Sequence, residues 1–210
     1  MENYYFMRSV LGWLAEPRHF NRLMAITLRF VAALVVPLSL VTFFKAGKVI
    51  FDLPASVILG GIVFQMFYIV AIYCVVHGLF IRARDVDALA GGDYNMFPLM
   101  ALIIRAIAEG MASFICLVAI GGGIFVWFTG KGVSAILNPP PHFLPVYGDT
   151  TFMGGIEFMV GGVLSAITML GVAYLSADVL RLLFELARRG NGSQHTLSEQ
   201  TYKLRSGTGN

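Results

Sequence analysis

Charged residues and cysteines are scarce in this sequence of 210 residues. Asp, Glu, Lys and Arg together make up 13% of the chain, whereas hydrophobic residues make up 57%. A soluble domain carries about 25% charged residues, so the composition argues against a soluble globular protein. The only cysteines, Cys74 and Cys116, lie inside different hydrophobic runs, and they do not indicate a disulfide framework.

The sequence also lacks the patterns that carry common chemistry. Its four histidines are scattered, and no spacing of His, Cys and carboxylates predicts a metal site. The glycine-rich stretch 121–132 departs from a phosphate-binding loop, because Gly132 rather than Ser or Thr follows Lys131. We therefore predict no catalytic residue, no cofactor and no metal, and we expect a protein that is not an enzyme. A membrane enzyme acting on lipid is the least favoured class.

What the sequence does contain is four long hydrophobic runs. Each is continuous, whereas the strands of a membrane β-barrel alternate with period two. A helix needs roughly 20 apolar residues to cross a bilayer. The sequence thus predicts an all-α integral membrane protein, a bundle of four transmembrane helices with spans at about 23–44, 55–81, 98–128 and 152–177.

The segments outside these spans predict further features. Residues 1–22 combine aromatic and aliphatic residues with a basic collar, which is typical of an amphipathic helix lying in the membrane interface. The hydrophobic pattern of the fourth span continues too far for the bilayer alone, so we expect this helix to extend into the cytoplasm to residue 189. Residues 190–210 have little to bury, and we predict a disordered cytoplasmic tail.

The third span carries two charges one helical turn apart, Arg105 and Glu109. On a helical wheel both fall on a face of alanines and glycine, which lets another helix approach closely. Bulky residues such as Ile107, Val118 and Phe125 fall on the opposite face, and we expect that face to contact lipid. Arg105 precedes Glu109 in the weaker order for an intrahelical pair, so partners on other helices are expected as well.

Other polar residues fall inside or near the ends of the spans, and with this pair they form a candidate intramembrane polar network. Its members are Arg29, Gln65, His77, Arg105, Glu109, Asp178 and Arg181. Ionisable groups within a membrane are costly and often functional. The sequence leaves two interpretations open, a structural pair that fixes helix register and a relay for protons or ions.

The distribution of Lys and Arg predicts the orientation. Nine flank the spans on one side and three on the other: Arg8, Arg18, Arg22, Arg82, Arg84, Arg188, Arg189, Lys203 and Arg205 against Lys45, Lys48 and Lys131. Positive residues favour the cytoplasmic side, so both termini are predicted to be cytoplasmic in a multi-pass protein, with a bacterial inner membrane as the expected location. The net charge of +3 fits basic flanks beside anionic lipid, and no nucleic-acid partner is predicted.

Two functional hypotheses follow. The leading one is an assembly, anchoring or scaffold subunit of a membrane complex, in contact with the bilayer and with other membrane subunits. The proline-containing connection 130–151 is the longest between spans, and it is either a docking surface or lid, or an ordered cap. The alternative is an oligomeric ion or proton channel or transporter, with several copies of the chain and Glu109 as the carrier.

Overall fold

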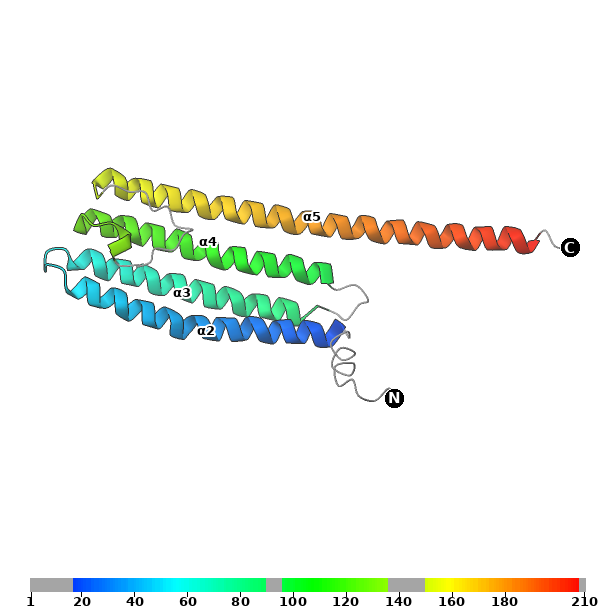
Figure 1. Ribbon diagram of the computed structural model, residues 1–210, viewed down its shortest axis with the longest axis horizontal. Helices are drawn as coiled ribbons and strands as arrows, with labels where there is room; N and C mark the ends of the chain where they lie inside the picture. Colours follow the sequence, from blue (N-terminus) through cyan, green and yellow to red (C-terminus); the bar gives the residue numbers. More distant parts are fainter. Residues whose placement is uncertain (1–16, 90–95, 136–149, 208–210) are drawn as a thin grey trace, which may run out of the picture.

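The chain forms four long helices in the computed structural model, which describes residues 17–89, 96–135 and 150–207. Figure 1 shows the helices side by side. Their bounds are α2 Pro17–Phe51, α3 Ile58–Asp87, α4 Met96–Thr129 and α5 Phe152–Gly207, and a short 3-10 helix, η1, spans Val133–Ala135. The described residues contain no strand. Each of the four helices is long and apolar enough to cross a membrane, as the sequence predicts.

The ends of the helices differ from the sequence prediction in two places. Within the predicted N-terminal segment 1–22, proline was expected to end the amphipathic helix before the basic collar, but Pro17 is the first residue of α2. This position suits proline because its missing N–H has no helical partner there. Residues 1–16 lie outside the described part. At the other end, α5 continues through Gly190 to Gly207, where a tail was predicted from 190. Extending an existing helix avoids the cost of nucleation, and this segment contains no proline.

The helices form an open layer, whereas the sequence prediction was a bundle. Each helix packs against its neighbours in the chain: α2 on α3, α3 on α4, and α4 on α5. In Figure 1 α2 and α5 lie at opposite edges of this layer, and no extensive packing joins them among the described residues. The two middle helices are therefore covered on two sides, and the two outer helices on one.

Closely spaced glycines explain how a middle helix can pack against two neighbouring helices. A Cβ atom at Gly121 of α4 would lie 2.7 Å from the Cβ of Phe67 on α3. One at Gly123 would lie 2.3 Å from Cγ of Met159 on α5. Both distances are too short for a real side chain, so α4 needs glycine at both contacts. Small residues allow such close approach between helices.

The double packing of α4 corrects the expectation that its bulky face contacts lipid. Val118 and Phe125 are fully buried, and the Phe125 ring lies 6.1 Å from the ring of Phe64 on α3. Ile107 is exposed, as expected of that face. The prediction was wrong for Val118 and Phe125 because it gave α4 one packing face, whereas α3 covers a second one.

The last helix extends well past the layer. Its 56 residues correspond to a length of about 84 Å at 1.5 Å per residue. Figure 1 shows α5 projecting at the end where α2 begins, α3 ends and α4 begins. A bilayer including its headgroups is about 40–45 Å thick. The helix α5 is therefore much longer than a helix needs to be to cross it.

Candidate functional site

The most extensive polar contact within the described chain joins Arg82 of α3 to Glu109 of α4. Arg82 Nε donates a hydrogen bond to Glu109 Oε2 at 2.8 Å, and a terminal guanidinium nitrogen donates to Oε1. Arg82 also donates to Asp85 Oδ2, one turn further along α3, at 2.9 Å. The paired geometry matches the two donors of a guanidinium to the two oxygens of a carboxylate, which is a strong form of this interaction.

The last helix joins the same cluster through Tyr174. Its hydroxyl donates to Glu109 Oε1 at 2.5 Å. The guanidinium of Arg105 lies 4.8 Å from the centre of the Tyr174 ring, and Arg105 Nη2 donates to Asp178 Oδ1 at 2.6 Å. The two charges of α4 thus have partners on different helices, with Arg105 bound to Asp178 of α5 and Glu109 bound chiefly to Arg82 of α3.

The first helix has an ion pair of its own. Arg29 Nη2 lies 2.7 Å from Oδ2 of Asp87, the last residue of α3. Together these contacts link all four helices at the end of the layer from which α5 projects. We call this set the charged belt, and its members are Arg29, Arg82, Asp85, Asp87, Arg105, Glu109, Tyr174 and Asp178.

Three residues of the predicted network lie outside the charged belt. Gln65 Nε2 donates to the carbonyl of Phe43 on α2 at 3.4 Å, which is a cross-helix bond far from Glu109. His77 stacks on Tyr73, with ring centres 5.6 Å apart. Arg181 is exposed on α5, one turn past Asp178. The structure therefore brings together Arg29, Arg105, Glu109 and Asp178 in the belt.

The residues that sequence reasoning left out of the network are those that pair with its members, chiefly Arg82, Asp87 and Tyr174. Arg82 and Asp87 fall in the polar connection after the second predicted span, and α3 continues as a helix through both. Tyr174 precedes Asp178 by four residues, so both lie on one side of α5. This spacing could have predicted the contact from the sequence. Arg105 and Glu109 are also four residues apart, so the two pairs of polar side chains can face each other on neighbouring helices.

The geometry of Glu109 determines what this cluster can do. Its two carboxylate oxygens accept three hydrogen bonds, two from Arg82 and one from Tyr174. A charged group in an apolar setting is stable only when it is paired and hydrogen-bonded. Each of these bonds comes from another helix, so the cluster fixes α3, α4 and α5 in one register. Among the described residues, no group of three or more His, Cys, Asp or Glu side chains is arranged to hold a metal ion.

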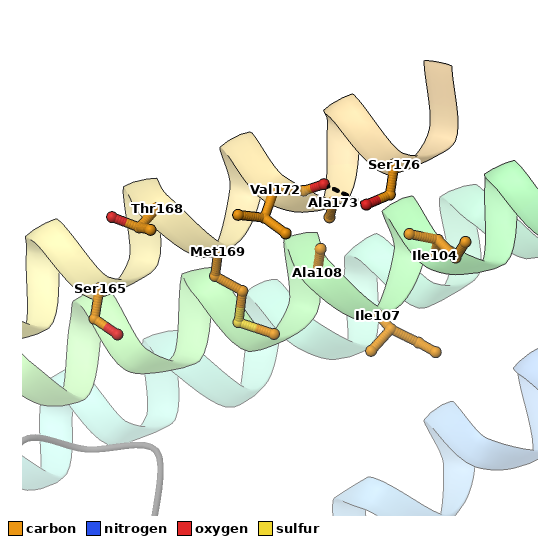
Figure 2. Close-up of a pocket in the computed structure, with 9 residues that line it drawn as sticks. All are labelled: Ile104, Ile107, Ala108, Ser165, Thr168, Met169, Val172, Ala173 and Ser176. Atoms are coloured by element: carbon orange, nitrogen blue, oxygen red, sulfur yellow. Dashed lines mark hydrogen bonds between the residues drawn. The ribbon is translucent and has the colours of Figure 1, made fainter. Parts of the chain in front are cut away.

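A second feature is a groove of about 650 Å³ between α4 and α5 (Figure 2). Its lining is mostly apolar, with three hydroxyl-bearing residues from α5, and consists of Ile104, Ile107, Ala108, Ser165, Thr168, Met169, Val172, Ala173 and Ser176. The hydroxyls of Thr168 and Ser176 donate to carbonyls of their own helix at 2.8 and 2.7 Å. Their hydrogen-bonding needs are met within the helix, so this surface is compatible with an apolar environment.

Comparison of the chain with family models, with curated proteins and with solved structures finds no match. Function is therefore inferred from the residues and their geometry.

Proposed function

We propose that this chain is a multi-pass membrane protein that works as an assembly or anchoring subunit, binding a transmembrane helix of another subunit in the groove between α4 and α5. The observation that carries the proposal is an apolar surface on α5 that begins in the groove and continues past the charged belt. The chain would sit with the belt on the cytoplasmic side, because Lys and Arg are concentrated at that end.

The position of the apolar side chains on α5 supports this function. Leu183 follows Ser176 by seven residues, or two turns, so it lies on the same side of the helix as the groove. It is 55% exposed, and Leu186, one turn further, is 65% exposed. At 1.5 Å per residue they lie about 8 and 12 Å beyond Asp178.

In the proposed orientation the inner edge of the apolar part of the bilayer lies at the charged belt, and the two leucines lie beyond that edge. The headgroup layer on each side is roughly 5–8 Å thick, so Leu186 reaches the water. Burying one leucine side chain is worth about 1.5–3 kcal/mol relative to leaving it exposed to water. A partner helix that runs along the groove and follows α5 out of the membrane would bury both residues.

The groove has the surface that helix association in lipid requires. Because lipid tails are as apolar as leucine, helices associate through close packing and hydrogen bonds, and small residues favour it. Ala108, Ala173 and Ser176 supply small side chains on both walls of the groove. The charged belt sets the positions of α4 and α5, so it would define the shape of this surface.

The test is photo-cross-linking in native membranes with a reactive amino acid at Ser176 or Leu183. A matched control carries the same group at Ile26, an exposed residue of α2 that precedes Arg29 of the charged belt by three residues. The proposal predicts one and the same membrane protein cross-linked from both α5 positions, and no such product from Ile26. Cross-links to lipid alone, or only to another copy of this chain, would contradict it.

A second experiment tests whether the groove itself is the contact. Ser176→Trp fills the groove, whereas Ile167→Trp places the same bulk at an exposed site nine residues away, on the opposite side of α5. We expect Ser176→Trp to abolish the cross-link from Leu183 and Ile167→Trp to leave it intact. Equal loss in both variants would show that the groove is not the binding surface.

The second candidate function is an oligomeric ion or proton channel with Glu109 as carrier. It is favoured by the way Glu109 joins polar groups of three helices, because such clusters occur in proton relays. Proton and cation flux into liposomes measures it directly. A flux that is abolished by Glu109→Gln supports the channel, and a flux that is unchanged in this variant eliminates it.

A further inference from the structure

A second groove lies between α2 and α3, in the other half of the layer. Its volume is about 390 Å³, and it is lined by three basic side chains and two apolar ones: Arg29, His77, Arg84, Phe80 and Ile81. It is distinct from the groove between α4 and α5, with which it shares no residue. It lies at the end of the layer where the charged belt links the helices.

The charges around this groove favour an anion. One nitrogen of the Arg29 guanidinium contacts Asp87, but a guanidinium has five N–H donors, so others remain for a ligand. Arg84 is exposed, and none of the ion pairs within the described part of the chain involves it. Asp87 compensates one of the two guanidinium charges, so the groove has a net positive charge.

The apolar wall of the groove favours a lipid over a free ion. Phe80 and Ile81 are about half exposed beside the basic groups, and Tyr73, stacked on His77, is more exposed still. These side chains form an apolar surface that starts at the basic residues and runs towards the middle of the layer. An acyl chain can lie on such a surface, whereas a small inorganic anion gains nothing from it.

The basic residues of this groove lie at two depths along α3. His77 precedes Arg84 by seven residues, which is about 10 Å along the helix. If Arg84 and Arg29 bind the phosphate at the membrane surface, His77 lies at the deeper level of the glycerol esters. The N–H group of an imidazole can donate a hydrogen bond to an ester carbonyl oxygen.

We propose that the groove between α2 and α3 binds an anionic phospholipid from the cytoplasmic leaflet. Arg29 and Arg84 bind its phosphate, His77 donates to the ester region, and an acyl chain lies on Phe80 and Ile81. Basic pockets between transmembrane helices on this side of a membrane are known to bind anionic headgroups. The proposal requires that the chain span a membrane, but it does not depend on the assembly function.

The test measures lipid bound to the purified full-length protein, with any subunits that accompany it, by native mass spectrometry. Phosphatidylglycerol and phosphatidylcholine are titrated separately, because they share the phosphate and the acyl chains but differ in net charge. We expect preferential binding of phosphatidylglycerol. Arg84→Gln should weaken this binding about fivefold, which is the order expected for one basic residue beside anionic lipid.

The control is Arg181→Gln, which removes the same charge from an exposed position on α5, at the same end of the layer but away from the groove. It should leave the affinity for phosphatidylglycerol unchanged. Equal affinity for the two lipids, or equal weakening by the two substitutions, would overturn the proposal. Displacement of phosphatidylglycerol by millimolar inorganic phosphate would show that the groove binds free phosphate and would overturn the lipid assignment.

Discussion

Helices α2 and α4 have the same mean hydropathy over their most apolar windows, but they differ in how they pack. In the most apolar 18-residue window, 11% of the residues of α2 are buried and 50% of those of α4. The difference lies in side-chain size. Gly121 and Gly123 let α4 approach two neighbours, whereas α2 carries large exposed residues such as Phe30, Leu38 and Phe44. Hydropathy therefore indicates which segments suit a membrane, and the positions of small residues determine which of them become central.

The ion pairs also differ between the middle and the outer helices, in how far their side chains are exposed. The side chains of Arg82 and Glu109, between the two middle helices, are 22% and 26% exposed. Those of Arg29 and Asp87, which join the outer helix α2 to α3, are 42% and 41% exposed. Breaking an ion pair that is shielded from solvent by removing one partner lowers the free energy of unfolding more than breaking an exposed pair, because the remaining charge is left in an apolar setting without a partner.

The largest effect is expected from breaking the central pair. Arg82→Gln leaves the Glu109 carboxylate without its main partner, and we expect a loss of about 3–5 kcal/mol in the free energy of unfolding. Its matched control is Arg29→Gln, for which a loss of at most about 1 kcal/mol is expected, as for an exposed pair. Equilibrium unfolding in mixed detergent micelles measures both. Equal losses would contradict the distinction between the central and outer pairs.

A double variant sharpens this result. Replacing both partners, with Arg82→Gln and Glu109→Gln together, removes the unpaired charge as well as the ion pair. Losing one partner costs more than losing both, because only the single variants leave a charged group unsatisfied. We therefore expect the double variant to have a higher free energy of unfolding than Arg82→Gln alone. A double variant as unstable as the sum of the two single variants would show that the two residues are not coupled.

An intermediate effect is expected from the contact between α4 and α5. A Cβ atom at Gly162 would lie 2.1 Å from the Cβ of Ala119, so Gly162→Ala should force the helices apart and cost about 1–3 kcal/mol. Gly171→Ala is the control, because no atom of another helix lies within 4 Å of a Cβ at that position. The same unfolding experiment should show no loss for the control. A stable Gly162→Ala protein would mean that the two helices do not approach as closely as described.

The smallest effect is expected from truncating single aliphatic side chains. Ile115 of α4 is 1% exposed and Ile26 of α2 is 51% exposed. In micelles the apolar surroundings reduce the transfer contribution, so Ile115→Ala loses mainly packing contacts, on the order of 1 kcal/mol. Ile26→Ala should change the free energy of unfolding by less than about 0.5 kcal/mol. A larger loss at Ile26 would indicate that α2 is covered by another part of the assembly.

The four long helices could be predicted from the sequence because each hydrophobic run is long and uninterrupted. The partners of the charges could not. Arg105 and Glu109 were placed on one packing face of α4, but the face alone does not say that Glu109 binds Arg82 and Arg105 binds Asp178. Those pairs depend on how far each helix is shifted along its neighbour, which is set by contacts such as Gly162 against Ala119. The open layer was missed for a similar reason, because one helical wheel suggests one packing face.

In the proposed assembly function, a helix of another subunit binds in the groove between α4 and α5. The most direct test is the mass and composition of the complex that carries this chain, extracted gently from its native membrane. We predict a complex that contains at least one other membrane protein and that loses it when Ser176 is replaced by Trp. A monomer, or an assembly of this chain alone, would contradict the claim, and the second of these results would make Glu109-dependent flux the next measurement.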